Sequence, residues 1–183
     1  MNIGMIPAKT ARLAPAREAL IDVSSGRRLT FGDLDERVRR LGNALMGPLG
    51  LSKGARVAVL ARNCIEYMEV YYGCARVGLI VQPLNWRLGG EELVKIASGG
   101  EPAVLMYSAE YAEVAATLAT QAGIPASFAF GNGSDGSYEA LLAQASAEEP
   151  VQSASVTDDD PVLILYTGGT TGESKGALHT HRS

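Results

Sequence analysis

Apolar and polar positions follow two different periods along this 183-residue chain. Short runs of valine, isoleucine, leucine and alanine predict buried strands at residues 55–61, 79–84, 103–107, 127–130 and 162–166. Between these runs, apolar residues recur every three or four positions, which predicts helices at residues 63–77, 91–98, 109–122 and from the turn at 131–136 to residue 145. Strands that alternate with helices predict an α/β fold, with a largely parallel sheet covered by helices.

The pattern is less regular before this alternation begins. Residues 1–28 predict an irregular lead-in with one short strand at 19–23. A helix is expected from Thr30 to about residue 49, because the Thr30 hydroxyl can accept a hydrogen bond from the amide three residues on and Asp33 can bond back. The charged face of this helix is expected to be solvated; it carries Asp35, Glu36, Arg39 and Arg40. In the next helix, Asn63 with Glu66 predicts a similar cap.

By pattern the chain divides into a lead-in at 1–28, an α/β subdomain at 29–146, an acidic linker at 147–161 and a last segment at 162–183. The linker contains three aspartates at 158–160, for which a solvated loop is a simpler interpretation than a metal site. His179 and His181 would share one face of a strand, as metal ligands can, but polar residues at a strand end are again the simpler interpretation. Cys64 and Cys74 are too few for a disulfide framework and are expected to be buried.

Composition excludes several classes of function. The formal net charge is −4 and the sequence pI is about 5.2, which argues against a basic nucleic-acid-binding face. No run of 18 apolar residues predicts a transmembrane helix, and the first residues lack the pattern of a secretion signal. A cytoplasmic location is therefore expected.

The most distinctive stretch follows the last predicted strand. Residues 167–175 contain three glycines and four hydroxyl side chains, and they end at Lys175. Glycines let a backbone approach a ligand closely, and successive amides in such a turn can bind an anion. The stretch is not a Walker A loop, because Lys175 is followed by Gly176 and residues 176–181 predict a short strand where that motif has a helix. A polyphosphate-binding loop between strands is expected, and the alternative is a surface hairpin without a ligand.

At these residues the sequence resembles the adenylate-forming (AMP-binding) superfamily, whose signature reads Tyr/Phe-Thr-Ser-Gly-Thr-Thr-Gly-x-Pro-Lys-Gly. The chain departs from it at Gly168, where the family has serine, and at Ser174, where it has proline. Residues 29–34, 54–60 and 74–85 are similar to earlier family blocks, and 83–88 resembles acyl-CoA ligases. Family enzymes continue for several hundred residues, so the resemblance implies the N-terminal portion of such an enzyme, inactive by itself.

The resemblance also implies a chemistry. A carboxylate attacks ATP to give an acyl-adenylate and pyrophosphate, and CoA then displaces AMP; the acid would be fatty or aromatic. The expected contacts to the ATP phosphates are Thr167, Gly168, Gly169, Thr170, Thr171, Gly172 and Lys175. Thr167 is in addition a candidate ligand of Mg²⁺, and no catalytic residue is expected within this chain. A homo-oligomer is possible, because a partial domain exposes apolar surface.

Two alternatives stay open from the sequence. The chain could belong to an adenylation domain that loads a carrier protein. It could also be a non-catalytic α/β module that binds a nucleotide or another protein. A tightly ATP-binding, monodisperse chain would favour this last interpretation.

Overall fold

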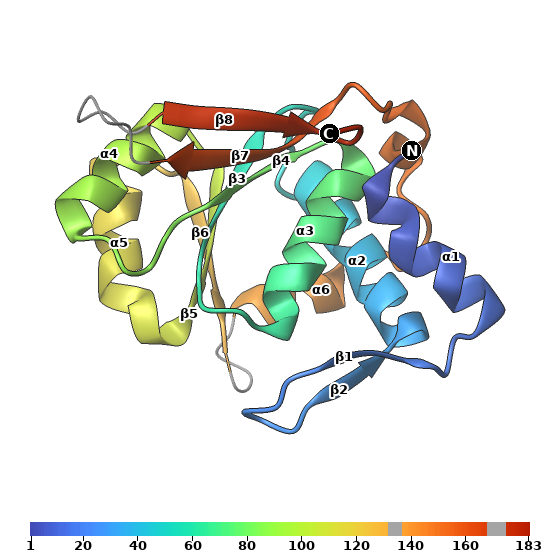
Figure 1. Ribbon diagram of the computed structural model, residues 1–183. Coiled ribbons are helices and arrows are strands. Elements are labelled where there is room, and N and C mark those ends of the chain that lie inside the picture. The colour runs from blue at the N-terminus through green and yellow to red at the C-terminus, as the bar shows by residue number, and fades with distance from the viewer. Residues whose placement is uncertain (132–136, 168–174) are drawn as a thin grey trace.

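A computed structural model describes residues 1–131, 137–167 and 175–183 of the chain. Its centre is a six-stranded sheet in the order β6-β5-β3-β4-β7-β8 (Figure 1). The strands are β3 (Arg56–Leu60), β4 (Ile80–Pro83), β5 (Val104–Ser108), β6 (Ala126–Phe130), β7 (Pro161–Thr167) and β8 (Lys175–Thr180). The first five strands in chain order are parallel, and β8 returns antiparallel to β7. The predicted α/β fold is confirmed.

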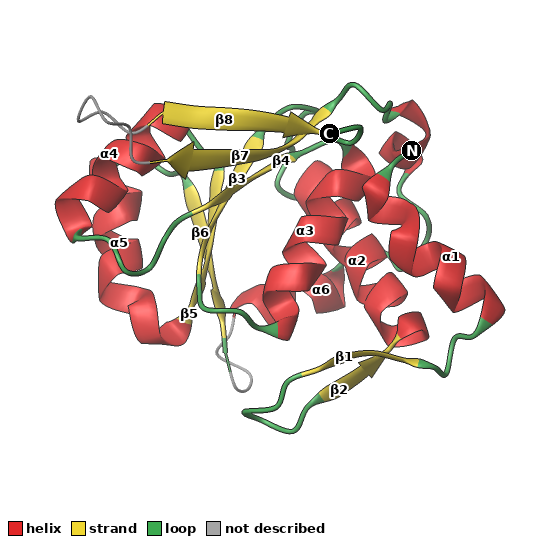
Figure 2. Ribbon diagram, viewed as in Figure 1, coloured by secondary structure: helices red, strands yellow, loops and turns green. Residues whose placement is uncertain are grey.

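Helices cover both faces of this sheet (Figure 2). One face packs against α2 (Phe31–Met46), α3 (Ile65–Val77) and α6 (Ser137–Gln144), and the other against α4 (Gly90–Gly100) and α5 (Ala112–Gln121). Short 3₁₀ helices occur at Ile3–Met5, Ala109–Tyr111 and Val151–Ser155. None of the helices in the described residues has the length and apolar character that a bilayer crossing requires.

The alternation along β3 shows why the core has two halves. Val57 and Val59 point toward α2 and α3, whereas Ala58 and Leu60 point toward α4 and α5, and all four are buried. Successive side chains of a strand point to opposite faces, so a strand that is apolar throughout needs cover on both sides. The near-continuous apolar runs of the sequence therefore correspond to the central strands.

The region before residue 31 differs from the sequence prediction. It contains α1 (Ile6–Leu13), which the expected irregular lead-in did not include, and Pro7 stands in its first turn, where proline is well tolerated. A separate antiparallel pair, β1 (Glu18–Ile21) and β2 (Arg28–Thr30), follows α1. The strand expected at 19–23 is thus present but paired with a second, unpredicted strand.

The predicted capping box of α2 is present. The Thr30 hydroxyl accepts a hydrogen bond from the Asp33 amide at 3.2 Å, and the Asp33 carboxylate accepts one from the Thr30 amide at 3.0 Å. The cap expected at the next helix is wrong: α3 begins after Cys64, whose side chain makes no capping hydrogen bond.

The charged face of α2 is only partly solvated, contrary to expectation. Asp35 accepts a hydrogen bond at 2.6 Å from Arg76 of α3, a side chain that is 1% exposed. Arg37 forms a paired contact with the buried Glu69 at 2.6 and 3.1 Å, and Glu69 also accepts from the Tyr138 hydroxyl at 2.8 Å. These charges join α2, α3 and α6 beneath the sheet.

The acidic linker also packs on the helices. The Glu149 carboxylate accepts a hydrogen bond from Arg76 at 2.9 Å, and the Asn43 amide donates to the backbone carbonyls of Ser146 and Glu148. The linker therefore follows the surface of α2 and α3 before it enters β7.

Candidate functional site

The edge of the sheet at which its parallel strands end is the natural place for a ligand. The chain leaves β3 on one side to form β4 and returns on the other side to form β5, so a topological switch point lies at β3. In open α/β sheets, ligands bind in the crevice outside the carboxyl ends of the strands at such a point. Thr167, the last residue of β7, lies at the carboxyl end of its strand.

Two of the predicted phosphate contacts are brought together at the loop end of the β7–β8 hairpin. Thr167 and Lys175 are direct partners across the two strands, and both are exposed. A hydroxyl and an ammonium group therefore flank the segment between them. The other predicted contacts lie in that segment, outside the described residues: Gly168, Gly169, Thr170, Thr171 and Gly172.

The opposite end of the hairpin is fixed to the start of the chain. His181, directly after β8, is 7% exposed, and its Nδ1 accepts a hydrogen bond from the Ile3 amide at 3.1 Å. The His181 amide donates to the Asp160 carbonyl at 3.1 Å. Burial lowers the pKa of His181 below 6.5, so the imidazole is neutral near neutral pH. These contacts give His181 a structural role at the end of a strand.

The three aspartates of the linker do not converge on one point. Asp158 pairs with the N-terminal amino group, Asp159 with Arg182 at 3.0 Å and Asp160 with Lys53 at 2.7 Å. Among the residues that the structure describes, no group of three histidine, cysteine or carboxylate side chains could hold a metal ion. The acidic run is therefore engaged in three separate ion pairs, and His181 is engaged by backbone groups at the end of β8.

A cluster of cations and aromatic rings at the same edge was missed in the sequence. The guanidinium groups of Arg62 and Arg87 lie 4.5 and 4.3 Å from the centre of the Trp86 ring, and Arg62 Nε donates to the Tyr111 hydroxyl at 3.2 Å. Arg62 follows β3, Trp86 follows β4 and Tyr111 follows β5. Two guanidinium groups therefore stack on one indole ring at this edge, and Arg62 also pairs with Glu110 at 3.6 Å.

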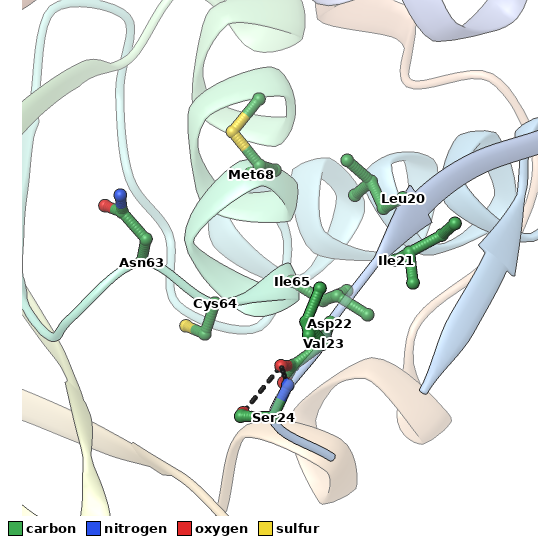
Figure 3. A pocket seen from close by; sticks show the side chains of 9 residues that line it. All are labelled: Leu20, Ile21, Asp22, Val23, Ser24, Asn63, Cys64, Ile65 and Met68. Atoms are coloured by element: carbon green, nitrogen blue, oxygen red, sulfur yellow. Dashed lines mark hydrogen bonds between the residues drawn. The ribbon is translucent and has the colours of Figure 1, made fainter. Parts of the chain in front are cut away.

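A separate pocket of about 350 Å³ lies between β1 and the start of α3 (Figure 3). Its lining is mostly apolar: Leu20, Ile21, Asp22, Val23, Ser24, Asn63, Cys64, Ile65 and Met68. Burial raises the pKa of the Cys64 thiol to about 12, so this cysteine stays protonated and is a poor nucleophile. The pocket therefore does not contain a reactive thiolate.

Comparison with known proteins gives the same assignment as the sequence signature. The profile of the family described as AMP-binding enzyme matches residues 8–183. A long-chain-fatty-acid–CoA ligase, FadD13 of Mycobacterium tuberculosis, is 34% identical over 182 residues, which are 100% of this chain and 35% of that protein. A feruloyl-CoA synthase of an Amycolatopsis species is 35% identical over 98% of this chain and 33% of its own length.

Solved structures agree with this relationship. The crystal structure of the N-terminal domain of FACL13 from Mycobacterium tuberculosis, with a bound inhibitor, has a TM-score of 0.87 and 32% identity, over 98% of this chain and 44% of that one. ATP-bound MatB from Rhodopseudomonas palustris has a TM-score of 0.76 and 28% identity, over 99% of this chain and 35% of that one. The chain thus spans about a third of the length of the curated relatives that it matches. It belongs to the AMP-binding enzyme family and has the N-terminal fold of the adenylate-forming enzymes.

Proposed function

We propose that the chain is the N-terminal part of an ATP-dependent, AMP-forming acyl-CoA synthetase. The observation that carries the proposal is the family match over residues 8–183, with Thr167 and Lys175 paired at the loop end of the hairpin. In this proposal the complete enzyme joins a carboxylic acid to ATP with release of pyrophosphate. CoA then takes the acyl group and AMP leaves.

The expected role of the hairpin follows from the charges in the first step. A carboxylate must approach the α-phosphorus of ATP, so two anions come together and the leaving pyrophosphate gains charge. Donors placed around the β- and γ-phosphates reduce this repulsion and stabilise the leaving group. Lys175 would supply the cation and Thr167 a hydroxyl, together with the backbone amides of residues 168–172.

Magnesium fits this arrangement through the phosphates. Mg²⁺ keeps several waters and is commonly held by one or two protein groups plus substrate phosphates. The Thr167 hydroxyl is an exposed neutral oxygen at the carboxyl end of β7 and would be one such group. When bound, the ion would neutralise phosphate charge beside Lys175.

The class of substrate is inferred from the relatives. These relatives are named as enzymes that join a long-chain fatty acid, ferulate or indoleacetate to CoA. We infer a fatty or aromatic carboxylic acid and CoA as substrates. One relative, ScoC of Streptomyces coeruleorubidus, is named a fatty acid–[acyl-carrier-protein] ligase and is 35% identical over 159 residues, which supports transfer to a carrier protein as the second candidate.

Substitution of Lys175 in the complete ligase tests the proposal. Hydrogen bonds to charged groups contribute about 1.5–3 kcal/mol, so Lys175→Ala should raise the KM for ATP roughly 10- to 100-fold in an assay of pyrophosphate release. Lys9→Ala, which removes an exposed lysine of α1, should leave the KM unchanged. An unchanged KM for ATP in Lys175→Ala would remove this lysine from the phosphate site.

The chain alone is proposed to be inactive. Its 183 residues should form no acyl-adenylate from ATP and a fatty acid, whereas the complete ligase should form it. Leu178 of β8 is 57% exposed and Leu165 of β7 is 37% exposed, so this strand pair presents apolar surface that favours self-association. Light scattering of the isolated chain would report dimers or larger species, and Leu178→Lys should reduce them.

A further inference from the structure

The outer half of the β7–β8 hairpin leaves the main sheet. The ladder between β4 and β7 joins Val81 to Leu163, near the beginning of β7. The ladder between β7 and β8 continues to Thr167 and Lys175. Figure 1 shows the two strands reaching past β4 toward α4. The direction of this outer half must therefore be set by contacts other than pairing with β4.

The ring of Tyr166 makes the first such contact, across the hairpin. Tyr166 is the direct partner of Gly176, so these residues stand immediately inside Thr167 and Lys175. A Cβ atom added at Gly176 would lie 3.2 Å from Tyr166 Cζ and 2.9 Å from Ile164 Cδ1. The two side chains of β7 thus occupy the space in which a side chain of residue 176 would stand. An aromatic ring over a cross-strand glycine is a known way to fix a strand pair at such a residue.

The hydroxyl end of the same ring reaches α4. A Cβ atom added at Gly99, in the last turn of α4, would lie 3.5 Å from the Tyr166 hydroxyl oxygen, and the ring packs with the core on this face of the sheet. Burial raises the pKa of Tyr166, so the hydroxyl is neutral there.

This turn of α4 is itself firmly attached to the sheet. The buried Gln82 side chain of β4 donates to the Ile96 carbonyl at 2.9 Å and packs so closely on Gly100 that an added Cβ would lie 2.1 Å from Gln82 Nε2. Arg56 of β3 donates to the Gly100 carbonyl at 2.9 Å, a favourable place for a cation at a helix C-terminus. The Tyr166 hydroxyl therefore lies beside a fixed part of the molecule.

We propose that Tyr166 is a positioning residue: its ring, held between Gly176 and the last turn of α4, sets the direction of the hairpin and so the placement of Thr167 and Lys175. The consequence for ATP rests on the proposed function, since it assumes that these two residues face the phosphates. The contact between Tyr166, Gly176 and Gly99 does not depend on that assumption.

NMR of the 183-residue chain tests the contact directly. We expect upfield ring-current shifts of the Gly176 Hα resonances and nuclear Overhauser contacts between the Tyr166 ring and Gly99. Tyr166→Phe keeps the ring over Gly176 and should keep the upfield shifts, whereas Tyr166→Ala should lose them. Residual dipolar couplings of the β7–β8 amides, compared with those of α4, report the direction of the hairpin. They should change most in Tyr166→Ala and less in Tyr166→Phe, which keeps the ring and loses only the hydroxyl beside α4.

Two further variants separate positioning from general loss of structure. Gly99→Leu places a large side chain at the Tyr166 hydroxyl, and because leucine favours a helix more than glycine the variant should remain folded. We expect it to shift the same dipolar couplings. Leu178→Ala, a truncation of an exposed residue in the same hairpin, should not. Unchanged couplings in both Tyr166→Ala and Gly99→Leu would overturn the positioning role.

Titration with tripolyphosphate, followed at the amides of Thr167 and Lys175, links position to binding. Tyr166→Ala should raise the dissociation constant roughly tenfold, which corresponds to about 1.4 kcal/mol, and Tyr166→Phe should leave it near that of the wild type. Equal affinity in Tyr166→Ala, despite changed couplings, would overturn the effect on phosphate placement. If the wild type shows no response to tripolyphosphate but the couplings still change in the variants, the phosphate role fails and the positioning role of Tyr166 stands.

Discussion

Among the described residues, Arg76 and Arg37 each pair with two carboxylates, and Arg76 is the more deeply buried of the two. Its guanidinium donates to Asp35 of α2 and to Glu149 of the linker, so one side chain joins three segments of the chain. Removal of one partner from a buried ion pair leaves the other charge without compensation. The stability of this side of the molecule therefore depends on a residue that makes no contribution to the apolar core.

Truncation of Arg76 should be costly. We expect Arg76→Ala to lower the free energy of unfolding in urea by about 1.5–3 kcal/mol, because Asp35 and Glu149 lose charged hydrogen bonds while Asp35 keeps its pair with Arg39 at 3.2 Å. Arg182→Ala, which removes an exposed pair with Asp159, should change it by about 1 kcal/mol or less. A cost for Arg76→Ala as small as that for Arg182→Ala would show that the buried pair is dispensable.

His181 should make stability depend on pH. Burial lowers the pKa of His181 in the folded chain below the 6.5 of the unfolded chain. Between the folded and the unfolded pKa the unfolded chain binds more protons, so the free energy of unfolding rises with pH. Asp160 opposes this shift, whereas Lys53 and the N-terminal amine add to it. The free energy of unfolding in urea should thus be lower at about pH 5 than at about pH 7.5. These two pH values lie roughly on either side of the usual histidine pKa.

The chain has only two histidines, so their effects can be separated. His181→Gln should flatten the dependence of stability on pH in this window. His179→Gln, the matched control at the other histidine, should leave this dependence in place. A slope that survives in His181→Gln would assign the effect to another group.

At the scale of single elements, the capping box of α2 gives a measurable effect. Thr30→Ala should lower the free energy of unfolding by about 1 kcal/mol, because the first turn loses a side-chain acceptor. The Thr30 hydroxyl and amide also hold the pKa of Asp33 below 3.8, and the substitution should move that pKa upward in an NMR titration. Thr117→Ala in α5, where the hydroxyl bonds to a carbonyl of its own helix, should cost less than about 0.5 kcal/mol.

The elements that could be predicted are those whose signals are local. The cap of α2 is written in residues three apart, and the strands of the sheet in runs of adjacent apolar residues, so each lies within one or two positions of its predicted range. Helix α1 is not evident from the sequence, because Pro7 suggests irregular chain although proline fits the first turn of a helix. The buried role of Asp35 could not be predicted, because its partner Arg76 lies in another helix.

The strand pair that borders the candidate site was predictable to the same extent. The spacing of glycines, hydroxyls and Lys175 is a local pattern, and it led to the correct strand pair around the loop. The cluster of Arg62, Trp86 and Tyr111 is different, since these residues meet only because β3, β4 and β5 are parallel neighbours. A parallel sheet was predicted, but its strand order was not, and the order decides which loops meet.

At the scale of the whole molecule, the first residues of the chain connect α3 to the end of β8. Asn2 donates to the Arg76 carbonyl at 3.0 Å and the Ile3 amide to His181, so α3 and the end of β8 are joined by one short segment. Gly4 permits this approach, because a Cβ atom there would lie 2.2 Å from the backbone nitrogen of Arg76. A side chain at this position cannot be accommodated without moving α3 or the segment.

Gly4→Ala should therefore detach the first five residues. We expect loss of protection of the Ile3 amide in hydrogen exchange and a lower thermal midpoint, by several degrees if the cost is about 1–3 kcal/mol. Gly90→Ala is the matched control, since an added Cβ meets no atom within 4 Å there. An Ile3 amide that remains protected in Gly4→Ala would show that the segment can shift and keep its contacts.

The ring of Tyr166 has one more consequence, for the sequences that this fold tolerates. Gly99 and Gly176 lie far apart along the chain, yet both border the volume of a single phenol ring. A larger residue at Gly176 requires both Ile164 and Tyr166 to give way, whereas an added Cβ at Gly99 would lie at an ordinary contact distance of 3.5 Å from the Tyr166 hydroxyl. Only side chains larger than alanine at position 99 should therefore compete with the ring for space. The residues that evolution accepts at position 99, in the last turn of α4, would in this way depend on the aromatic residue at position 166, with which the nucleotide-binding signature begins.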